Sequence, residues 1–362
     1  MNYIDGRLID SYPEERQPAL SDRPFVSVIM PVRNESRFIE ESLGAVLAQD
    51  YPNDRLEVLI ADGMSTDDTR EIISLVAASY PAIPVKIIDN PARIASTGLN
   101  AALKQARGDV IVRVDGHTFL EHDHVHQCVA ALQRSGADHV GGRMETVSEG
   151  RFGEAVSLAT GTSFGVGHGR FHYSDREEWS DTVSMGAWPR QVFERIGLFD
   201  EEQVRNQDDE FNYRLLENGG KILLSPNIRS RYYNRSTPRS LWRQYYQYGY
   251  WKIRVMQKHP LQMRPRQFAP PLFAAALVVG VLLAPFFNLA IWGAGIVIGS
   301  YALANIAASA LTARRAGWEL MPRLSLAFAA LHLSYGFGFL VGLVRFWNRW
   351  HDRGEWIVLR QD

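Results

Sequence analysis

The chain has 362 residues, a formal net charge of −1 and a single cysteine, Cys128. One cysteine excludes an internal disulfide and a cysteine-rich zinc site. The net charge averages unlike regions, because residues 1–228 carry a net charge of −14, whereas 229–266 hold ten Lys or Arg and no acid. Residues 268–311 and 324–344 carry no charge at all. A basic run that leads into apolar sequence favours a membrane surface as partner and argues against nucleic acid.

The first half of the chain alternates short β-branched runs with helical spacing of apolar residues. This alternation is typical of right-handed βαβ units around a mostly parallel sheet, which is the Rossmann-like α/β class. We predict strands at 26–30, 56–61, 84–88 and 109–114, and helices at 35–48, 65–76 and 94–106. Beyond residue 140 the pattern becomes irregular, and we expect one helix at 207–218 and short strands at 221–224 and 228–233.

Domain limits follow from these elements and from the charge pattern. The first residues contain acids and no apolar core, so they do not form a secretory signal, and we expect the α/β domain to face the cytoplasm. We predict a mobile lead-in at 1–23, an α/β domain at 24–232, a basic aromatic interfacial segment at 233–267, a transmembrane region at 268–346 and a tail at 347–362.

The apolar region is long enough for three membrane spans of roughly 20 residues. We place them at about 270–287, 289–311 and 324–344. The arginines between the second and third spans belong in the cytoplasm by the positive-inside rule. A third full crossing would place the arginines of the tail outside, which the same rule disfavours. Two alternatives remain: the third segment is re-entrant, or it crosses fully and the basic tail is tolerated outside.

Polar residues follow each predicted parallel strand, at the sheet edge where α/β proteins bind ligands. They comprise Pro31 to Glu35, Asp62, Asp89 with Asn90, and Asp115 to His117. The turn after the first strand contains neither a dinucleotide-binding glycine pattern nor a phosphate-loop lysine, which argues against both classes of nucleotide enzyme. Asp62 suits a contact to a base or ribose, or an Asx-turn. Glu35 is placed either to touch a nucleoside or simply to begin its helix.

Asp115-Gly116-His117 is a candidate metal site. A carboxylate and an imidazole two residues apart, beyond a strand end, can both reach one divalent ion such as Mn²⁺ or Mg²⁺. Such an ion would neutralise a departing diphosphate. The alternative is a turn that Asp115 caps and from which His117 is merely exposed. Six further histidines are treated as surface or loop residues: His122, His124, His126, His139, His168 and His172.

Three acids begin the predicted helix at Gln207, and one carboxylate there suffices to act as general base toward a hydroxyl. Arg205 and Arg214 flank these acids and are candidates to orient them or to bind phosphate. The basic segment interleaves arginines with tyrosines and tryptophans immediately before the first span. This pattern favours a helix that lies in the interface of the cytoplasmic leaflet.

Four segments together resemble the family 2 inverting glycosyltransferases with a GT-A fold, especially the membrane-anchored succinoglycan-biosynthesis type. They read VSVIMPVRNES, LIADGMSTDDT, GLNAALKQARGDVIVRVDGHT and GLFDEEQVRNQDDEFNYRLLENGGKI, and the resemblance covers roughly residues 24–350. Where that family has Asp-x-Asp this chain has Asp115-Gly116-His117, and where the family has Glu-Asp it has Gln207-Asp208.

The resemblance implies a catalytic domain followed by transmembrane helices, with a divalent metal as cofactor. Asp208 would be the catalytic base, and Asp115 and His117 would be metal ligands. Nucleotide-sugar contacts are expected from Pro31, Arg33, Glu35, Asp62 and Asp115. Contacts to the acceptor or the membrane are expected from Arg205, Arg243, Gln244 and Trp251.

The function that follows is transfer of a sugar from a nucleotide-diphosphate donor to a lipid-linked acceptor in exopolysaccharide or cell-envelope glycan synthesis. The enzyme would be a multi-pass protein of the cytoplasmic membrane, with its catalytic domain in the cytoplasm and no nucleic-acid partner. Two alternatives stay open. One is direct transfer to a polyprenyl phosphate, which needs no general base, and the other is an inactive sugar-nucleotide-binding scaffold.

Overall fold

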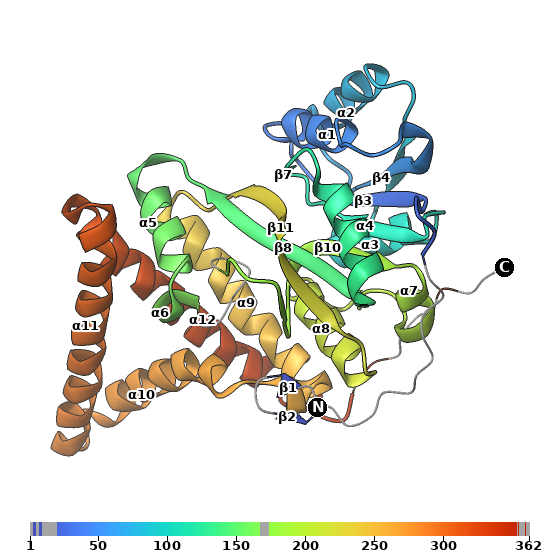
Figure 1. Cartoon of the computed structure of the whole chain (residues 1–362). Coiled ribbons are helices and arrows are strands. Elements are labelled where there is room, and N and C mark those ends of the chain that lie inside the picture. The colour runs from blue at the N-terminus through green and yellow to red at the C-terminus, as the bar shows by residue number, and fades with distance from the viewer. Residues whose placement is uncertain are drawn as a thin grey trace. The chain divides into compact units, whose positions relative to one another are not determined.

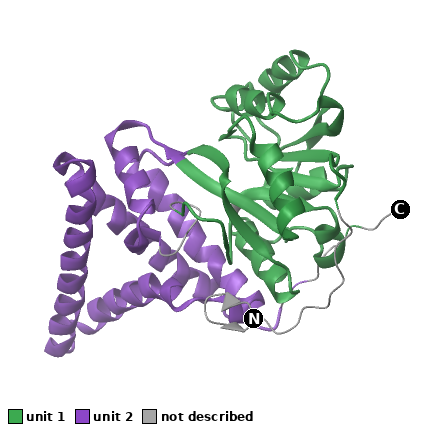
Figure 2. Cartoon of the chain, in the orientation of Figure 1, with its two compact units in different colours: residues 1–145, 170–232, 355–362 green, residues 146–169, 233–354 purple. Residues whose placement is uncertain are grey.

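The computed structural model describes Tyr3–Ile4, Arg7–Leu8, residues 20–166 and 174–352, and residues 354 and 359. The chain forms two compact units (Figure 2). The first unit comprises residues 1–145, 170–232 and 355–362, and the second comprises 146–169 and 233–354. The α/β domain predicted at 24–232 stays a prediction. Within that range, residues 146–169 belong to the second unit. Of the predicted lead-in, the structure describes residues 20–23 and a short antiparallel pair, β1 (Tyr3–Ile4) and β2 (Arg7–Leu8).

The first unit is built on one mixed sheet with the strand order β5-β4-β3-β6-β10-β8-β11-β7, and β9 pairs with β11 (Figure 1). The four strands predicted in the first half are present and parallel, as β3 (Val26–Val32), β4 (Leu56–Asp62), β5 (Val85–Asp89) and β6 (Val110–Arg113). The fold class predicted from the sequence is therefore confirmed. Antiparallel pairs complete the sheet, through β7 (Thr118–Leu120), β8 (His139–Val147), β9 (Glu178–Trp179), β10 (Ser184–Pro189) and β11 (Ile222–Tyr233).

Helices cover both faces of this sheet, and alternate residues of each strand feed two separate cores. Val28 and Met30 of β3 pack with helices α1 (Ile39–Leu47), α2 (Thr69–Ala78) and α4 (His124–Ser135). Ile29, between them, packs on the other face with α3 (Ala95–Leu103), α7 (Gln191–Ile196) and α8 (Gln207–Glu217). Side chains alternate across a strand, so a continuous apolar run is what a strand buried on both faces requires.

Three expected element boundaries are wrong. The helix expected from residue 35 begins at Ile39. The helix expected from residue 65 begins at Thr69, because the Ser65 side chain donates to Asp62 instead of capping a helix. The two short strands expected at 221–224 and 228–233 are one strand, β11. Its first half pairs with β9 and its second half with β7, so the chain passes Pro226 without leaving the sheet.

The second unit is helical and contains α5 (Gly150–Thr160), α6 (Ser163–Val166) and α9 (Pro238–Lys258). It also contains α10 (Ala269–Leu283), α11 (Asn288–Ala316) and α12 (Met321–Arg345). In the described part of the chain, three helices are long and apolar enough to cross a membrane, and they correspond to the three predicted spans. Their surroundings differ. Within the apolar 18-residue stretch of each helix, the buried share is 17% for α10, 6% for α11 and 50% for α12.

Much of the burial of α12 comes from the basic helix α9, which runs beside it (Figure 1). A Cβ atom added to Gly338 would stand 2.0 Å from the Tyr246 carbonyl oxygen, and one added to Gly342 would stand 2.5 Å from that of Tyr250. The two backbones touch at successive turns that advance in the same direction, so the helices are parallel. Glycines at these positions permit this close approach.

The composition of the basic segment suggested that all of its charge faces a membrane surface, but part of that charge is buried. Lys252, Arg254 and Lys258 of α9 are buried. Arg254 donates to Gln257 and to the Arg349 carbonyl oxygen, and it pairs with Asp352 at 3.4 Å. A buried guanidinium group requires such partners because its desolvation is otherwise unfavourable. Only part of the basic charge of α9 is therefore available to a lipid.

Candidate functional site

The polar residues that follow the parallel strands form two groups in the first unit. The inner group follows β6 and centres on Asp115. Arg113, which is buried in that strand, donates from Nε to Asp115 Oδ1 at 3.0 Å and from its terminal nitrogen to Oδ2 at 3.2 Å. Burial opposes ionisation of Asp115, but Arg113 outweighs it and lowers the pKa of this carboxyl. Asp115 is therefore held as a carboxylate.

His117 belongs to the same group and is tied to Glu35. Its Nδ1 lies 3.0 Å from Glu35 Oε1, and its ring packs at 5.2 Å between centroids against Tyr232 of β11. A Cβ on Gly116 would stand 3.0 Å from Glu35 Cγ, so a side chain there would displace Glu35. A carboxylate on Nδ1 fixes the tautomer that leaves Nε2 without a proton, which is how histidines that bind metals are commonly held.

The outer group follows β4 and β5. Asp62 is fully buried, and its carboxylate accepts from the Ser65 hydroxyl at 2.5 Å and lies 2.8 Å from Arg70 Nε. Arg70 also pairs with Asp89. These contacts order the loop after β4, so Asp62 has a structural role whether or not it also touches a nucleotide. Arg33 lies across this loop, with its Cβ 3.1 Å from where a Cβ on Gly63 would stand.

Asp208 stands in the first turn of α8, which begins after Asn206 in the left-handed conformation, with φ 61°. Burial raises the pKa of Asp208, the Asp209 carboxylate raises it further, and the positive charge of Arg113 opposes both. The Asp209 amide donates to Asp208 Oδ1 at 3.0 Å. A carboxyl with a raised pKa is a better proton acceptor than an ordinary surface aspartate.

Electrostatics link Asp208 to the group after β6. Asp115 contributes to the raised pKa of Asp208, and Arg205 and His117 both contribute to the lowered pKa of Asp115. Sequence-distant candidates therefore converge on one site, with two carboxylates whose pKa values move in opposite directions. Such a divergence is typical of an acid–base site.

The sequence offered Arg214 two roles, to orient the acids or to bind phosphate, and its contacts fit the first. Arg214 is buried, pairs with the equally buried Glu210 at 2.9 Å, and donates to the Ile196 and Leu198 carbonyl oxygens. All of its hydrogen-bonding capacity is directed into the protein. This buried pair locks α8, and with it Asp208, onto the segment after α7.

Replacing Arg214 with Leu should lower the free energy of unfolding by about 3–5 kcal/mol, because Glu210 would remain buried without a partner. Denaturant unfolding of the full chain in detergent measures this loss. The matched control is Arg55→Leu, whose pair with Asp54 is exposed and 4.0 Å apart. That variant should change stability by no more than about 1 kcal/mol. Equal losses in both variants would show that the buried pair has no special role.

The acceptor or membrane candidates Arg243, Gln244 and Trp251 lie on α9 of the second unit. Gln244 donates to the Tyr248 hydroxyl at 2.8 Å. Trp251 packs against Tyr250 and Phe346, with ring centroids 5.5 and 5.7 Å apart. Trp251 is thus partly used for internal packing, whereas Arg243 is exposed.

Two histidines treated as surface residues are buried. His124 bonds through Nδ1 to the Arg229 carbonyl oxygen at 2.7 Å, and His139 stacks on Trp188 with centroids 4.1 Å apart. Burial lowers the pKa of both rings, to about 3 for His139, so both are neutral core residues. Neither belongs to the candidate site. Two more of the histidines treated as surface residues lie outside the described residues: His168 and His172.

Arg113 and the Glu35 to His117 pair are the main site features that the sequence analysis did not identify. Arg113 had a detectable signal, because it is the one charge within an apolar strand and stands two residues before Asp115, on the same face. The pair had no such signal, since 82 positions separate its members. Among the described residues, no group of three or more His, Cys, Asp and Glu is arranged to hold a metal ion.

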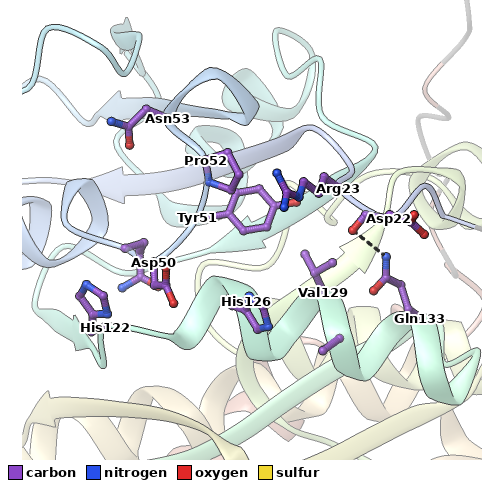
Figure 3. A pocket seen from close by; sticks show the side chains of 12 residues that line it. Asp22, Arg23, Asp50, Tyr51, Pro52, Asn53, His122, His126, Val129 and Gln133 are labelled. Atoms are coloured by element: carbon purple, nitrogen blue, oxygen red, sulfur yellow. Dashed lines mark hydrogen bonds between the residues drawn. The ribbon is translucent and has the colours of Figure 1, made fainter.

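A hollow of about 670 Å³ in the first unit is separate from this site (Figure 3). It is lined by Asp22 and Arg23, just before β3, by Asp50 to Asn53, before β4, and by residues of α4 and the loop preceding it. It therefore lies at the amino ends of the parallel strands, whereas ligands of α/β sheets bind at the carboxyl ends. None of the candidate site residues lines it.

Comparison with known proteins identifies the fold and family. Residues 27–197 match the profile described as glycosyl transferase family 2. A Methanococcus voltae protein, dolichyl N-acetyl-alpha-D-glucosaminyl phosphate 3-beta-D-2,3-diacetamido-2,3-dideoxy-beta-D-glucuronosyltransferase, is 31% identical over 240 residues, which cover 65% of this chain and 74% of that protein. The chain belongs to glycosyl transferase family 2. It is a nucleotide-sugar-dependent glycosyltransferase.

One further relative and one solved structure extend the similarity over nearly the whole chain. The succinoglycan biosynthesis protein ExoA of Rhizobium meliloti is 29% identical over 324 residues, covering 89% of this chain and 96% of that protein. The structure of a mannosyltransferase from Pyrobaculum calidifontis, solved with GDP-Man and Mn²⁺, superposes with a TM-score of 0.57 at 23% identity and covers 91% of this chain and 90% of that one. This likeness supports the GT-A fold expected from the sequence.

Proposed function

We propose that this glycosyltransferase moves a sugar from a nucleotide-diphosphate donor to a lipid-linked saccharide acceptor, with inversion at the anomeric carbon, in exopolysaccharide or cell-envelope glycan synthesis. One observation carries the proposal. Asp208, with a raised pKa, stands within electrostatic reach of the Arg113, Asp115 and His117 group at the carboxyl end of β6.

Asp208 acts as the general base in this proposal. Inversion by direct displacement requires the acceptor hydroxyl to lose its proton as it attacks the anomeric carbon. A carboxylate with a raised pKa takes that proton more readily than an ordinary aspartate does. Asp209 and Arg113 set the basicity of Asp208 from opposite sides, because one raises its pKa and the other lowers it.

The residues around Asp115 fit a divalent metal. The Asp115 oxygens accept from Arg113, but each carboxylate oxygen has a second lone pair to offer. Glu35 holds His117 through Nδ1, which leaves Nε2 for a metal. A site with one or two protein ligands suits an ion that donor phosphates also bind, as Mg²⁺ and Mn²⁺ commonly do. Such an ion, when bound, would stabilise the charge that develops on the departing diphosphate.

The loops after β3 and β4 would bind the nucleotide part of the donor. Pro31, Arg33 and Asp62 line this edge of the sheet, and the contacts of Asp62 with Ser65 and Arg70 hold the second loop in place. Arg205 lies within electrostatic reach of Asp115, and we assign it to a phosphate of the donor.

The acceptor assignment is supported by relatives. The Methanococcus voltae protein is named for a dolichyl-linked substrate, and the Rhizobium meliloti protein for succinoglycan biosynthesis. Direct transfer to polyprenyl phosphate is the main rival, but an acceptor that is already ionised would not need a carboxylate with a raised pKa. An inactive scaffold is disfavoured because Asp62, Asp115 and Asp208 are all present in a chain that belongs to glycosyl transferase family 2.

A panel of nucleotide sugars tests this function directly. The full chain in lipid nanodiscs would be incubated with each donor, with Mn²⁺ and with a lipid extract that supplies lipid-linked saccharides. We expect one donor to label a lipid-extractable product whose new linkage has the inverted configuration. Retained configuration, or transfer to polyprenyl phosphate alone, would contradict the proposal.

We further propose that α10 and α11 cross the membrane and that α12 does not. Half of the apolar 18-residue stretch of α12 is already buried within the protein. Its parallel partner α9 carries five cationic side chains between Pro238 and Lys258. Insertion of each such charge at the bilayer centre costs about 2.5–3.5 kcal/mol, so the pair is unsuited to cross together. Two crossings also keep the arginines after α11 and after α12 on one side.

This arrangement predicts that both ends of the chain face the cytoplasm. A reporter that is active only outside the cytoplasm should be inactive at either terminus and active in the turn at Phe286. Cysteine labelling with a membrane-impermeant reagent provides an independent readout, after Cys128 is replaced by Ala. Labelling from outside at position 350 would show that α12 crosses. Failure to label at 286 would show that α10 and α11 do not.

A further inference from the structure

The exposed side of α9 carries a hollow of about 440 Å³ lined by Arg239, Trp242, Arg243 and Tyr246. These residues recur at intervals of three and four, so they share one helix face. The hollow belongs entirely to the second unit and involves no residue assigned to the donor or to the base. Its lining combines two cations with two aromatic rings and contains no acid.

The two arginines are available to a ligand. Both side chains are exposed, and within the described part of the chain neither forms an ion pair or hydrogen bond. This contrasts with Arg254 on the same helix, which is buried and fully engaged. Guanidinium groups one helical turn apart suit an anion with several oxygens, because each offers a planar pair of donors.

The aromatic residues supply an apolar wall beside this charge. Trp242 is 40% exposed, and its ring lies 6.4 Å from that of Phe337 on α12. The indole is therefore anchored at the seam between α9 and α12 while one part of it faces outward. Tryptophan and tyrosine favour the headgroup level of a bilayer. A ligand that satisfies the whole hollow must be anionic at one end and apolar at the other.

We propose that this hollow binds the phosphate head and first isoprenoid carbons of a polyprenyl-linked acceptor. The proposal rests on the lipid-linked acceptor of the proposed function and names where its lipid end is held. Two unpaired arginines match a head with about two negative charges, as the diphosphate that joins a polyprenyl chain to a saccharide carries at neutral pH, whereas the phosphodiester of a bulk phospholipid carries one. Farnesyl phosphate, whose monoester also carries about two charges, is a simple probe of the same head. A nucleotide would leave the apolar wall without a hydrocarbon partner.

The test uses the full chain in nanodiscs of neutral phosphatidylcholine, with farnesyl phosphate as the probe. We expect the Arg239→Gln/Arg243→Gln variant to bind farnesyl phosphate about tenfold or more weakly, since it loses charge-assisted hydrogen bonds. Trp242→Ala should weaken farnesyl phosphate and farnesol alike. Inorganic phosphate and phosphatidylglycerol should compete poorly with the probe.

The matched control is Arg314→Gln/Arg315→Gln, which removes the same charge from two exposed arginines at the end of α11. It should bind the probe as the wild type does. Equal losses in both double variants, or full competition by phosphatidylglycerol, would show general attraction to anionic lipid and overturn the site. Donor hydrolysis by the wild-type chain without acceptor separates this result from the proposed function. If the wild type hydrolyses no nucleotide sugar, the proposed function fails while the binding result for the hollow still stands.

Discussion

Asp208→Asn should reduce sugar transfer by about 10²–10⁴-fold, the range that a positioned general base contributes. The amide keeps the size of the carboxylate but cannot take a proton from the acceptor hydroxyl. Donor binding should be nearly intact, because the donor contacts are assigned to the loops after β3, β4 and β6. Turnover and donor affinity, measured on the same preparation, separate these effects. Near-wild-type turnover would remove Asp208 from the mechanism and favour transfer to an acceptor that is already ionised.

The neighbouring acid provides the control, through the pH dependence of turnover. Burial and Asp209 raise the pKa of Asp208, and the base works only when deprotonated, so activity should fall as pH decreases through that raised pKa. The acid limb should thus lie above the range of an ordinary aspartate. Asp209→Asn removes one cause of the shift and should move the limb to lower pH with turnover retained. If Asp209→Asn instead abolishes transfer, Asp209 is the base.

His117→Ala should weaken Mn²⁺-dependent donor binding strongly, because it removes the nitrogen assigned to the metal. Glu35→Gln should weaken it by about 10–100-fold, the usual effect of losing the carboxylate that orients a metal-bound histidine. Glu35 acts only through His117, which lies 3.0 Å away, so the loss in Glu35→Gln should be smaller than that in His117→Ala. The readout is the Mn²⁺ signal in electron paramagnetic resonance, titrated with and without nucleoside diphosphates, so it does not depend on turnover.

His126→Ala is the matched control, since His126 is exposed on α4 and lies outside the site. It should leave Mn²⁺ binding unchanged. Imidazole should also favour Mn²⁺ over Mg²⁺ in the wild type, and His117→Ala should reduce that preference. Unchanged Mn²⁺ affinity in His117→Ala would show that His117 is not a metal ligand and serves only to pack against Tyr232.

The parallel half of the sheet and the polar residues at its carboxyl edge can be predicted from the sequence alone. Strands such as β3 and β4 are apolar on both faces, and that pattern is local, so it can be read without knowing any partner. Asp115 and His117 were found the same way, from their place at the end of a strand. Asp208 was singled out among three acids at a helix start only by the family resemblance. The uncharged stretches that form α10, α11 and α12 were likewise predicted from the sequence.

The contacts that those residues make depend on how distant segments fold together. Glu35 could equally begin a helix or touch a ligand until the fold placed it on His117. Arg214 could equally orient the acids or bind phosphate until the fold paired it with the buried Glu210. The third apolar segment was ambiguous for the same reason. Composition reports how apolar a helix is, but only packing reveals whether lipid or another helix such as α9 covers it, because both environments satisfy the same hydrophobic surface.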